Sequence, residues 1–508
     1  MVLRTPGSEP RTRTAVFHRR QRESARNHAI GEAILFPSRG FSATDLLARA
    51  APMAGRAIAI AAACALAAPA VLAARPDSGS ALAPVPSAAA ADPNADLGQL
   101  LNSGSELTVA GERVNAELLR RFYARHGFAP VWTDRKPQAM SLMNAVLRAG
   151  NQGLPPELFH INLLLSPATL SPLDRELLLS DAFLSYADAL ARGIMPVERR
   201  PDDETLTPEP IDIPAALDAA VADPDPAAAI EALAPTTPTY RLLRQALLNF
   251  QTDSPAGGKA ATTRLHQIEV NLERQRWLPR RLPADRVWVN VADERVVLYH
   301  DDQPVYSSKV IVGQDVRINQ SPEFQATITG IYFNPPWTIP QDIAAKEILP
   351  KADRDPNYLA EHHMITLPNG ELQQIAGPNS GLGQLMFDMR NRFDVYLHDT
   401  PSKNYFARDD RHISHGCIRV EKPRELAALL MQQPMDEIDQ TIATGDTTRP
   451  DLPQPMPVFV VYETAFADAD GKLQFRPDPY GRDAEIWQYI DPGRRAIAKR
   501  EASGQRGG

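Results

Sequence analysis

The pattern of apolar residues changes near residue 285, and this change constrains the fold more than any other feature of the sequence. Before it, apolar side chains recur three and four positions apart, as at Leu118 and Phe122. After it, short runs rich in Val, Tyr and Trp alternate with turn residues, starting with 287–291, 295–300 and 304–313. The sequence therefore predicts an α+β protein in which a helical N-terminal domain precedes a strand-rich β-sandwich or barrel.

The same patterns divide the chain. The helical scaffold domain is expected over 96–282, although its Pro-, Asp- and Ala-rich stretch 197–237 is interpreted as a long excursion or linker. The strand-rich domain is expected over 283–465, and 466–508 is a C-terminal extension whose end, after about residue 491, is expected to be disordered. Residues 338–391 contain a helical stretch and a glycine-rich loop between strands, and we interpret them as a lid.

The N-terminus has the layout of an export signal. Residues 53–74 have a basic start, an apolar middle and small residues at the exit, which predicts a signal peptide or an N-terminal membrane anchor. Residues 75–95 form a Pro/Ala linker. Residues 1–52 are Arg-rich without apolar periodicity, and the hypothesis is that they are a leader without structure and that Met53 is the true start.

Charge and cysteine usage narrow the function. The 508-residue chain has a formal net charge of −8, and because its first 74 residues are Arg-rich, the remainder is more acidic still. An acidic protein is a poor partner for nucleic acid. Two cysteines exclude a disulfide framework, and Cys64 lies in the apolar export segment. Cys417 is therefore left alone in the mature protein.

The residues around Cys417 favour a reactive thiol. Cys417 follows Ser414, His415 and Gly416, and a glycine there lets the backbone direct N–H groups at one spot, as an oxyanion hole requires. A cysteine nucleophile needs an imidazole within hydrogen-bond reach. His398, at the end of a strand-like run, and His415, two residues from the thiol, are both candidates.

Two other interpretations remain open on residue types alone. His412, His415, Cys417 and His398 offer four ligands of the kind that zinc prefers. The thiol could equally be an inert core residue.

The segment from His398 to Cys417, in which Ser-His-Gly-Cys begins sixteen residues after the histidine, resembles the active-site signature of the YkuD-type L,D-transpeptidases. The resemblance implies that Cys417 is the nucleophile and His398 its base. It also implies that Ser414, His415 and Gly416 shape the pocket and the oxyanion hole.

Further residues are similar to the large periplasmic, YcbB-like branch of that family. Arg419 stands where this branch has arginine, and it could hold a substrate carboxylate, with a surface ion pair as the alternative. Trp337 could line a substrate groove or be a buried anchor. Tyr396 is placed with the predicted substrate-binding residues, and Asp399 is expected to orient His398 through its side chain or its carbonyl.

The resemblance implies a mostly antiparallel β-sandwich that cross-links peptidoglycan stem peptides in the periplasm through a cysteine acyl-enzyme. No cofactor or metal is expected, and 53–74 could tether the protein to the membrane. The alternatives are an L,D-carboxypeptidase using the same thiol, and a non-catalytic wall-binding protein. Relatives carry a helical peptidoglycan-binding module between two scaffold helices. Residues 251–263 are too short for one, so the chain departs from the family there.

Overall fold

The computed structural model describes residues 93–491 and 493, except 103, 105, 167–169, 201–205, 207 and 254–258. The predicted leader, the export segment, nearly all of the linker and the predicted disordered tail lie outside the described residues. Within the described ranges, no helix is both long and apolar enough to cross a membrane. The described residues belong to one compact unit.

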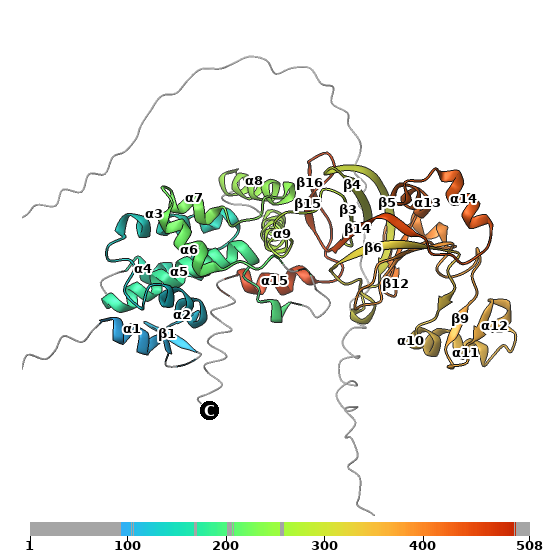
Figure 1. The fold of residues 1–508 in the computed structure, drawn as a ribbon, viewed down its shortest axis with the longest axis horizontal. Coiled ribbons are helices and arrows are strands. Elements are labelled where there is room, and N and C mark those ends of the chain that lie inside the picture. The colour runs from blue at the N-terminus through green and yellow to red at the C-terminus, as the bar shows by residue number, and fades with distance from the viewer. Residues whose placement is uncertain are drawn as a thin grey trace, which may run out of the picture. The chain divides into compact units, whose positions relative to one another are not determined.

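The first half of that unit is helical (Figure 1). Its elements are α1 (Pro93–Asn102), β1 (Leu107–Val109), β2 (Glu112–Val114), α2 (Ala116–Arg125), α3 (Lys136–Leu147), α4 (Ile161–Leu164), α5 (Pro172–Arg192), α6 (Ile213–Ala222), α7 (Pro226–Glu231), α8 (Pro238–Asp253) and α9 (Lys259–Gln275), with 3₁₀ turns at Ala149–Gln152, Pro156–Phe159 and Val197–Arg199.

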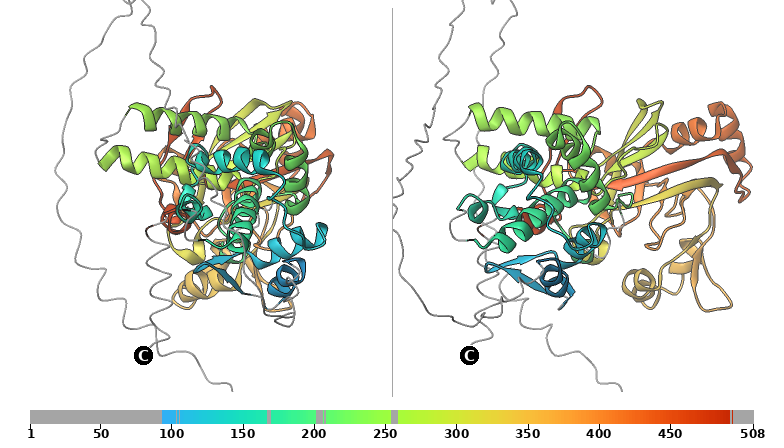
Figure 2. Two further views of the ribbon diagram at one scale, coloured as in Figure 1. Left: turned by 90° about the vertical axis from the view of Figure 1, so that its left-hand side faces the viewer. Right: turned by 60° about the vertical axis from the view of Figure 1, so that its left-hand side comes forward.

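Helix α5 is the centre of this half. Its N-cap Ser171 accepts a hydrogen bond from the Asp174 amide, and Pro172 occupies the first turn, where its missing N–H costs nothing. Leu177, Leu184 and other residues on several faces of α5 are fully buried, so the helix is surrounded by its neighbours. Helices α8 and α9, drawn in green, lie side by side, as Figure 2 shows.

The stretch 197–237 is not a linker. It contains α6 and α7, which pack on each other and on α5. Asp212 is the N-cap of α6 and Asp225 is the N-cap of α7, and the side chain of each accepts a hydrogen bond from a backbone amide in the first turn of its helix. Each helix also has a proline in its first turn. The prolines that suggested a linker therefore begin helices, and the alanines between them propagate these helices.

The second half is built on one nine-stranded sheet with the order β12-β5-β13-β11-β10-β6-β14-β3-β4. Its strands are β3 (Arg286–Asn290), β4 (Arg295–His300), β5 (Gln303–Gly313), β6 (Phe324–Phe333), β10 (Leu385–Asp388), β11 (Leu397–His398), β12 (His412–Ser414), β13 (Ile418–Val420) and β14 (Asp451–Val461). 3₁₀ turns lie at Arg317–Asn319 and Lys403–Ala407, and helices α13 (Pro423–Met431) and α14 (Met435–Ala443) precede β14.

The sheet is mostly antiparallel and returns on itself, because β4 also pairs with β5. Only β11–β13, β12–β5 and β14–β3 are parallel pairs among the named strands of this sheet. Alternate residues such as Val287 and Val289 point into its core. The predicted α+β class is confirmed.

An insertion lies between β6 and β10 and contains β7 (Trp337–Thr338), α10 (Gln341–Ile343), a π-helical turn (Ala344–Ile348), α11 (Leu349–Ala352), α12 (Tyr358–Glu361), β8 (Met364–Thr366) and β9 (Leu372–Gln374) (Figure 1). It has its own three-stranded sheet and its own small apolar core. We call residues 337–383 the insertion. Because β10 returns to the main sheet, the insertion is shorter than the expected 338–391 lid.

The last elements of the described residues are β15 (Ala465–Ala467), β16 (Leu473–Phe475) and α15 (Arg482–Ile490), and these elements contact both halves. Helix α15 packs on α9, where Asp483 and Arg274 form an ion pair of 2.5 Å. Ala465 joins the core of the helical half. We call residues 465–490 the C-terminal segment. These contacts make it part of the folded unit.

Candidate active site

The loop that carries Cys417 joins two strands held by the same neighbour. Strand β12 runs parallel to the end of β5 at Val312 and Gly313, and β13 runs antiparallel to it at Ile311 and Val310. Gly416 has a φ of +116°, a conformation that side chains with a Cβ rarely adopt. A glycine is therefore required immediately before Cys417.

Strand β11 brings His398 to this loop. It pairs in parallel with β13, so that His398 lies opposite Arg419, and the Ile418 amide donates to the Tyr396 carbonyl oxygen at 2.9 Å. Alternation along the strands directs Tyr396, His398, Cys417 and Arg419 to one face of the sheet. The structure thus gathers residues predicted to be the nucleophile, its base and two substrate-binding positions.

The His398 imidazole is neutral. Its burial, and after that the positive charge of Arg419, lower its pKa from the ordinary 6.5 to about 4. Nδ1 lies 2.5 Å from the backbone carbonyl oxygen of Asp399, which can only accept, so Nδ1 carries the hydrogen. This tautomer leaves Nε2 as a proton acceptor.

The Cys417 thiol is held protonated. Burial raises its pKa, and the Tyr396 backbone hydrogen bond and the Arg419 charge oppose that increase. The thiol contacts the Asp394 carbonyl oxygen, 3.7 Å from the sulfur. In the described residues it makes no hydrogen bond with His398. The resting pair is consequently a thiol and a neutral imidazole on one face.

The Arg419 side chain makes no ion pair or hydrogen bond within the described residues, and its Nε is buried without a partner. The predicted alternative, a surface ion pair, is therefore not found for this residue. Burial lowers the pKa of Arg419, and the nearby Cys417 raises it. A buried guanidinium edge without an anion leaves donors for a carboxylate.

One of the predicted oxyanion donors, the Gly416 amide, forms a hydrogen bond within the loop. The Gly416 amide donates to Ser414 Oγ at 3.1 Å, and Ser414 Oγ donates to the Cys417 carbonyl oxygen at 2.7 Å. The Ser414 side chain therefore stabilises the turn through these two hydrogen bonds. The Cys417 amide has no acceptor in the part of the chain that the structure describes, so it is the loop's available oxyanion donor.

His415 makes its contact outside the turn. It is exposed, and its Nε2 lies 2.7 Å from Oε1 of Glu347, which belongs to the insertion. This pair links the nucleophile's loop to the insertion. In the described residues, neither His415 nor His398 forms a hydrogen bond with the thiol.

Asp399 orients His398 through its carbonyl oxygen, one of the two predicted modes. Its carboxylate is engaged elsewhere, with the Gln384 amide at 2.9 Å and Lys403 Nζ at 2.7 Å. A Cβ added at Gly383 would lie 2.5 Å from the Asp399 carboxylate carbon. The loop before β10 therefore packs directly on this residue.

The two predicted aromatic contacts differ. Trp337 is half-buried and packs against the small core of the insertion, and a Cβ at Gly381 would lie 2.8 Å from its ring, so both the groove wall and the anchor stay open as predictions. Tyr396 is half-buried beside Cys417, and burial, followed by the charges of Asp394 and Asp388, raises its pKa. Only Tyr396 lies at the thiol.

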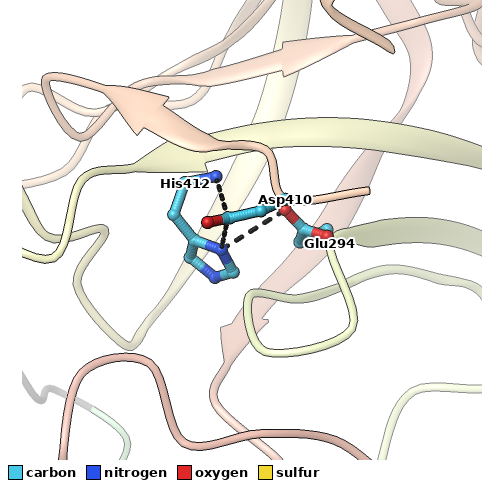
Figure 3. Close-up of side chains that lie close together, drawn as sticks. All are labelled: Glu294, Asp410 and His412. Atoms are coloured by element: carbon cyan, nitrogen blue, oxygen red, sulfur yellow. Dashed lines mark hydrogen bonds and ion pairs between the residues drawn. The ribbon is translucent and has the colours of Figure 1, made fainter. Parts of the chain in front are cut away.

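The four residues of the metal interpretation are not brought together. In the described ranges, the one group with metal-ligand spacing is Glu294, Asp410 and His412 (Figure 3). Nδ1 of His412 lies 2.8 Å from an Asp410 oxygen and 3.3 Å from a Glu294 oxygen, so it serves as their donor. Arg411 also pairs with Glu294 at 3.2 Å. Glu294, Asp410, Arg411 and His412 therefore form a cluster of ion pairs.

Several residues that contact the loop carrying Cys417 were not predicted from the sequence. They include Glu347, the partner of His415, and Ser321, whose Oγ donates to the Gly416 carbonyl oxygen at 2.7 Å. Ser321 is 95 residues from Gly416 in the chain. A lone serine or glutamate in a loop carries no spacing signal that could identify it.

Comparisons with known proteins identify domains in both halves of the chain. Residues 117–247 match the Scaffold domain, and residues 284–462 match the L,D-transpeptidase catalytic domain YkuD. A Haemophilus influenzae protein named "Putative L,D-transpeptidase" is 28% identical over 396 residues, which cover 73% of this chain and 78% of that protein. The chain therefore combines a Scaffold domain with a YkuD-type L,D-transpeptidase catalytic domain.

Solved structures also match part of the chain. An L,D-transpeptidase from Mycobacterium smegmatis is 12% identical with a TM-score of 0.19, and one from Enterococcus faecium is 10% identical with a TM-score of 0.16. Each match covers 35% of this chain, and 58% and 50% of those chains respectively. The match therefore spans only about half the length of these proteins, and the low TM-scores add nothing to the assignment of the fold.

Proposed function

We propose that the protein cross-links peptidoglycan stem peptides through a thioester on Cys417. The observation that carries the proposal is the face shared by Cys417, a neutral His398 with Nε2 as acceptor, and the unpaired guanidinium of Arg419. A nucleophile, a base and an anion-binding group are the parts that acyl transfer from a peptide with a free carboxylate requires.

The reaction follows from these groups. The Cys417 sulfur attacks the carbonyl carbon of the donor peptide while His398 Nε2 takes the thiol proton. The Cys417 amide stabilises the oxyanion, and the C–N bond breaks as His398 returns the proton to the leaving amine. A second stem's side-chain amine then attacks the thioester, losing a proton to His398 and releasing the Cys417 thiolate, which takes that proton back.

Arg419 is proposed to hold the donor's carboxylate. Its cation has no anion in the described structure, and a carboxylate beside Cys417 would place the adjoining peptide bond near the sulfur. The same charge lowers the pKa of both His398 and Cys417, which favours a neutral base and a developing thiolate.

The proposed compartment is the periplasm. The support is the export pattern of residues 53–74, which predicts that the chain leaves the cytoplasm. Peptidoglycan, the proposed substrate, lies on that side of the membrane. Whether 53–74 is cleaved or stays as a tether is tested by sequencing the N-terminus of the mature protein.

The product of the reaction tests the proposal. Purified protein given tetrapeptide muropeptides should form cross-linked dimers, or exchange the terminal D-Ala for an added D-amino acid, faster than it makes tripeptide. Mass spectrometry that shows tripeptide alone with abundant amine acceptor would instead support an L,D-carboxypeptidase. Retained wall binding without any turnover would support a binding protein.

A further inference from the structure

Ser321 is a buried serine behind the nucleophile's loop, on the segment that follows β5. Its side chain is fully buried, and its Oγ accepts from the Gly313 amide at 3.0 Å while donating to the Gly416 carbonyl oxygen at 2.7 Å. The approach requires Gly313, because a Cβ there would lie 1.9 Å from the Asn319 carbonyl oxygen. Local backbone geometry is thus arranged to bring this hydroxyl to Gly416.

The acceptor of Ser321 belongs to the peptide unit that contains the Cys417 amide. The peptide unit is planar and trans, so the Gly416 carbonyl and the Cys417 N–H point in opposite directions. A hydrogen bond that holds the carbonyl toward Ser321 therefore directs the N–H away from it. A glycine at position 416 leaves this peptide unit freer to rotate than any other residue type would.

Ser321 is itself held by residues from the C-terminal segment. Its amide donates to the Tyr480 hydroxyl at 3.3 Å, and its carbonyl oxygen accepts from Arg482 at 3.2 Å. The Tyr480 hydroxyl donates to the Gly313 carbonyl oxygen at 2.6 Å. Both residues lie beyond residue 462, where the match to the catalytic-domain model ends.

The C-terminal segment is in turn fixed in place. Arg482 forms a buried ion pair with Glu323 at 2.9 Å, and its neighbour Asp483 pairs with Arg274 of α9. A buried, paired guanidinium is costly to displace, because moving it leaves a buried charge uncompensated. The contacts therefore run from α9 through α15 and Ser321 to the Gly416–Cys417 peptide.

We propose that Ser321, supported by Tyr480 and Arg482, is a positioning residue that aims the Cys417 amide at the oxyanion of the acyl-transfer reaction. The inference rests on the proposed function, since it assigns a task within that reaction. It also makes the segment after β14 a working part of the catalytic unit.

Two probes of Cys417 separate positioning from general damage. A carbapenem acylates through a tetrahedral oxyanion and needs the amide, whereas iodoacetamide alkylates the sulfur and needs no oxyanion donor. Loss of an oxyanion-hole donor typically costs about 10²–10³-fold, and a misdirected donor should cost less. Ser321→Ala should therefore slow carbapenem acylation by about 10- to 100-fold and change the alkylation rate by less than about 3-fold. Ser321→Thr, which keeps the hydroxyl, should recover most of the acylation rate.

Tyr480→Phe gives a second test that keeps the ring and removes only the hydroxyl, and it should slow acylation in the same selective way by a smaller factor. Ser180→Ala is the matched control, because Ser180 is an equally buried serine with two hydrogen-bond partners in the helical half. It should leave both rates unchanged. Equal losses with both probes, or none in Ser321→Ala, would overturn the inference. A wild-type protein that takes up no carbapenem would overturn the proposed function instead.

Discussion

The buried imidazole of His398 gives the reaction a characteristic pH dependence. Because its pKa is lowered to about 4, His398 is neutral, and so able to act as a base, at every pH well above that value. The second-order acylation rate constant should lose its base-dependent part only as the pH falls through about 4. The carbapenem acylation rate measured between pH 3 and pH 8 checks this. An acid limb centred near pH 6.5, the ordinary value for histidine, would contradict it.

The two histidines should differ in their effect on rate. His398→Ala removes the positioned base, a loss that typically slows such reactions by about 10²–10⁴-fold. His415→Ala removes an exposed ion pair with Glu347, and such pairs contribute about 0.2–1 kcal/mol. We expect His415→Ala to slow acylation by less than about 10-fold. A larger loss at His415 than at His398 would reverse the assignment.

At the residue scale, the structure brings Cys417, His398 and the carbonyl of Asp399 close together, because they lie on two neighbouring strands and the loop between β12 and β13. Their roles in a reaction stay predictions. The sequence could not reveal that the Gly416 amide donates to Ser414 Oγ, or that Ser321 Oγ donates to the Gly416 carbonyl oxygen. These facts depend on side-chain rotamers and on contacts between distant segments, which spacing does not encode.

The insertion is an element that should be removable. It lies at the tip of the hairpin formed by β6 and β10, where Phe333 pairs with Leu385, and its apolar core is its own. Replacing residues 338–380 with a short Gly-Ser linker should leave the main sheet folded and weaken turnover of the stem peptide about 10-fold or more, because lids sequester the reaction. Circular dichroism and muropeptide assays measure the two effects. Unchanged turnover in a folded variant would show that the insertion is no lid.

At the element scale, the first strands of the main sheet were predicted better than helices α6 and α7. Strand β4 agrees with the expected range 295–300, because alternation is a strong local signal. The sequence does not predict helices α6 and α7, because a stretch rich in proline, such as 197–237, usually indicates a loop or linker. At the first turn a proline removes no hydrogen bond, and only the caps at Asp212 and Asp225 could have indicated the starts.

The whole described unit should unfold in one transition. One apolar cluster combines Met195 and Trp277 of the helical half, Phe459 of the main sheet, and Ile486 of α15. Phe459→Ala should cost about 3–5 kcal/mol, because it leaves a cavity in this shared cluster, and should lower a single melting temperature. Differential scanning calorimetry measures this. Two separate transitions, with only one shifted by the substitution, would refute a shared core.

The organisation of the whole molecule followed from the change in apolar period, which marks where helices give way to strands. The role of the C-terminal segment did not, because α15 contacts α9 and the Ser321 loop through buried ion pairs between residues far apart in the sequence. Pairing of that kind is decided by the folded topology.

The central claim is that Cys417 is the acyl-accepting nucleophile, and intact mass spectrometry after incubation with a carbapenem tests it most directly. The wild-type protein should gain the mass of one carbapenem, with the adduct located on the peptide that contains Cys417. Cys417→Ala should gain nothing, whereas the Ser180→Ala control should be labelled like the wild type. An adduct that persists in Cys417→Ala, or no adduct on a folded wild-type protein, would contradict the account.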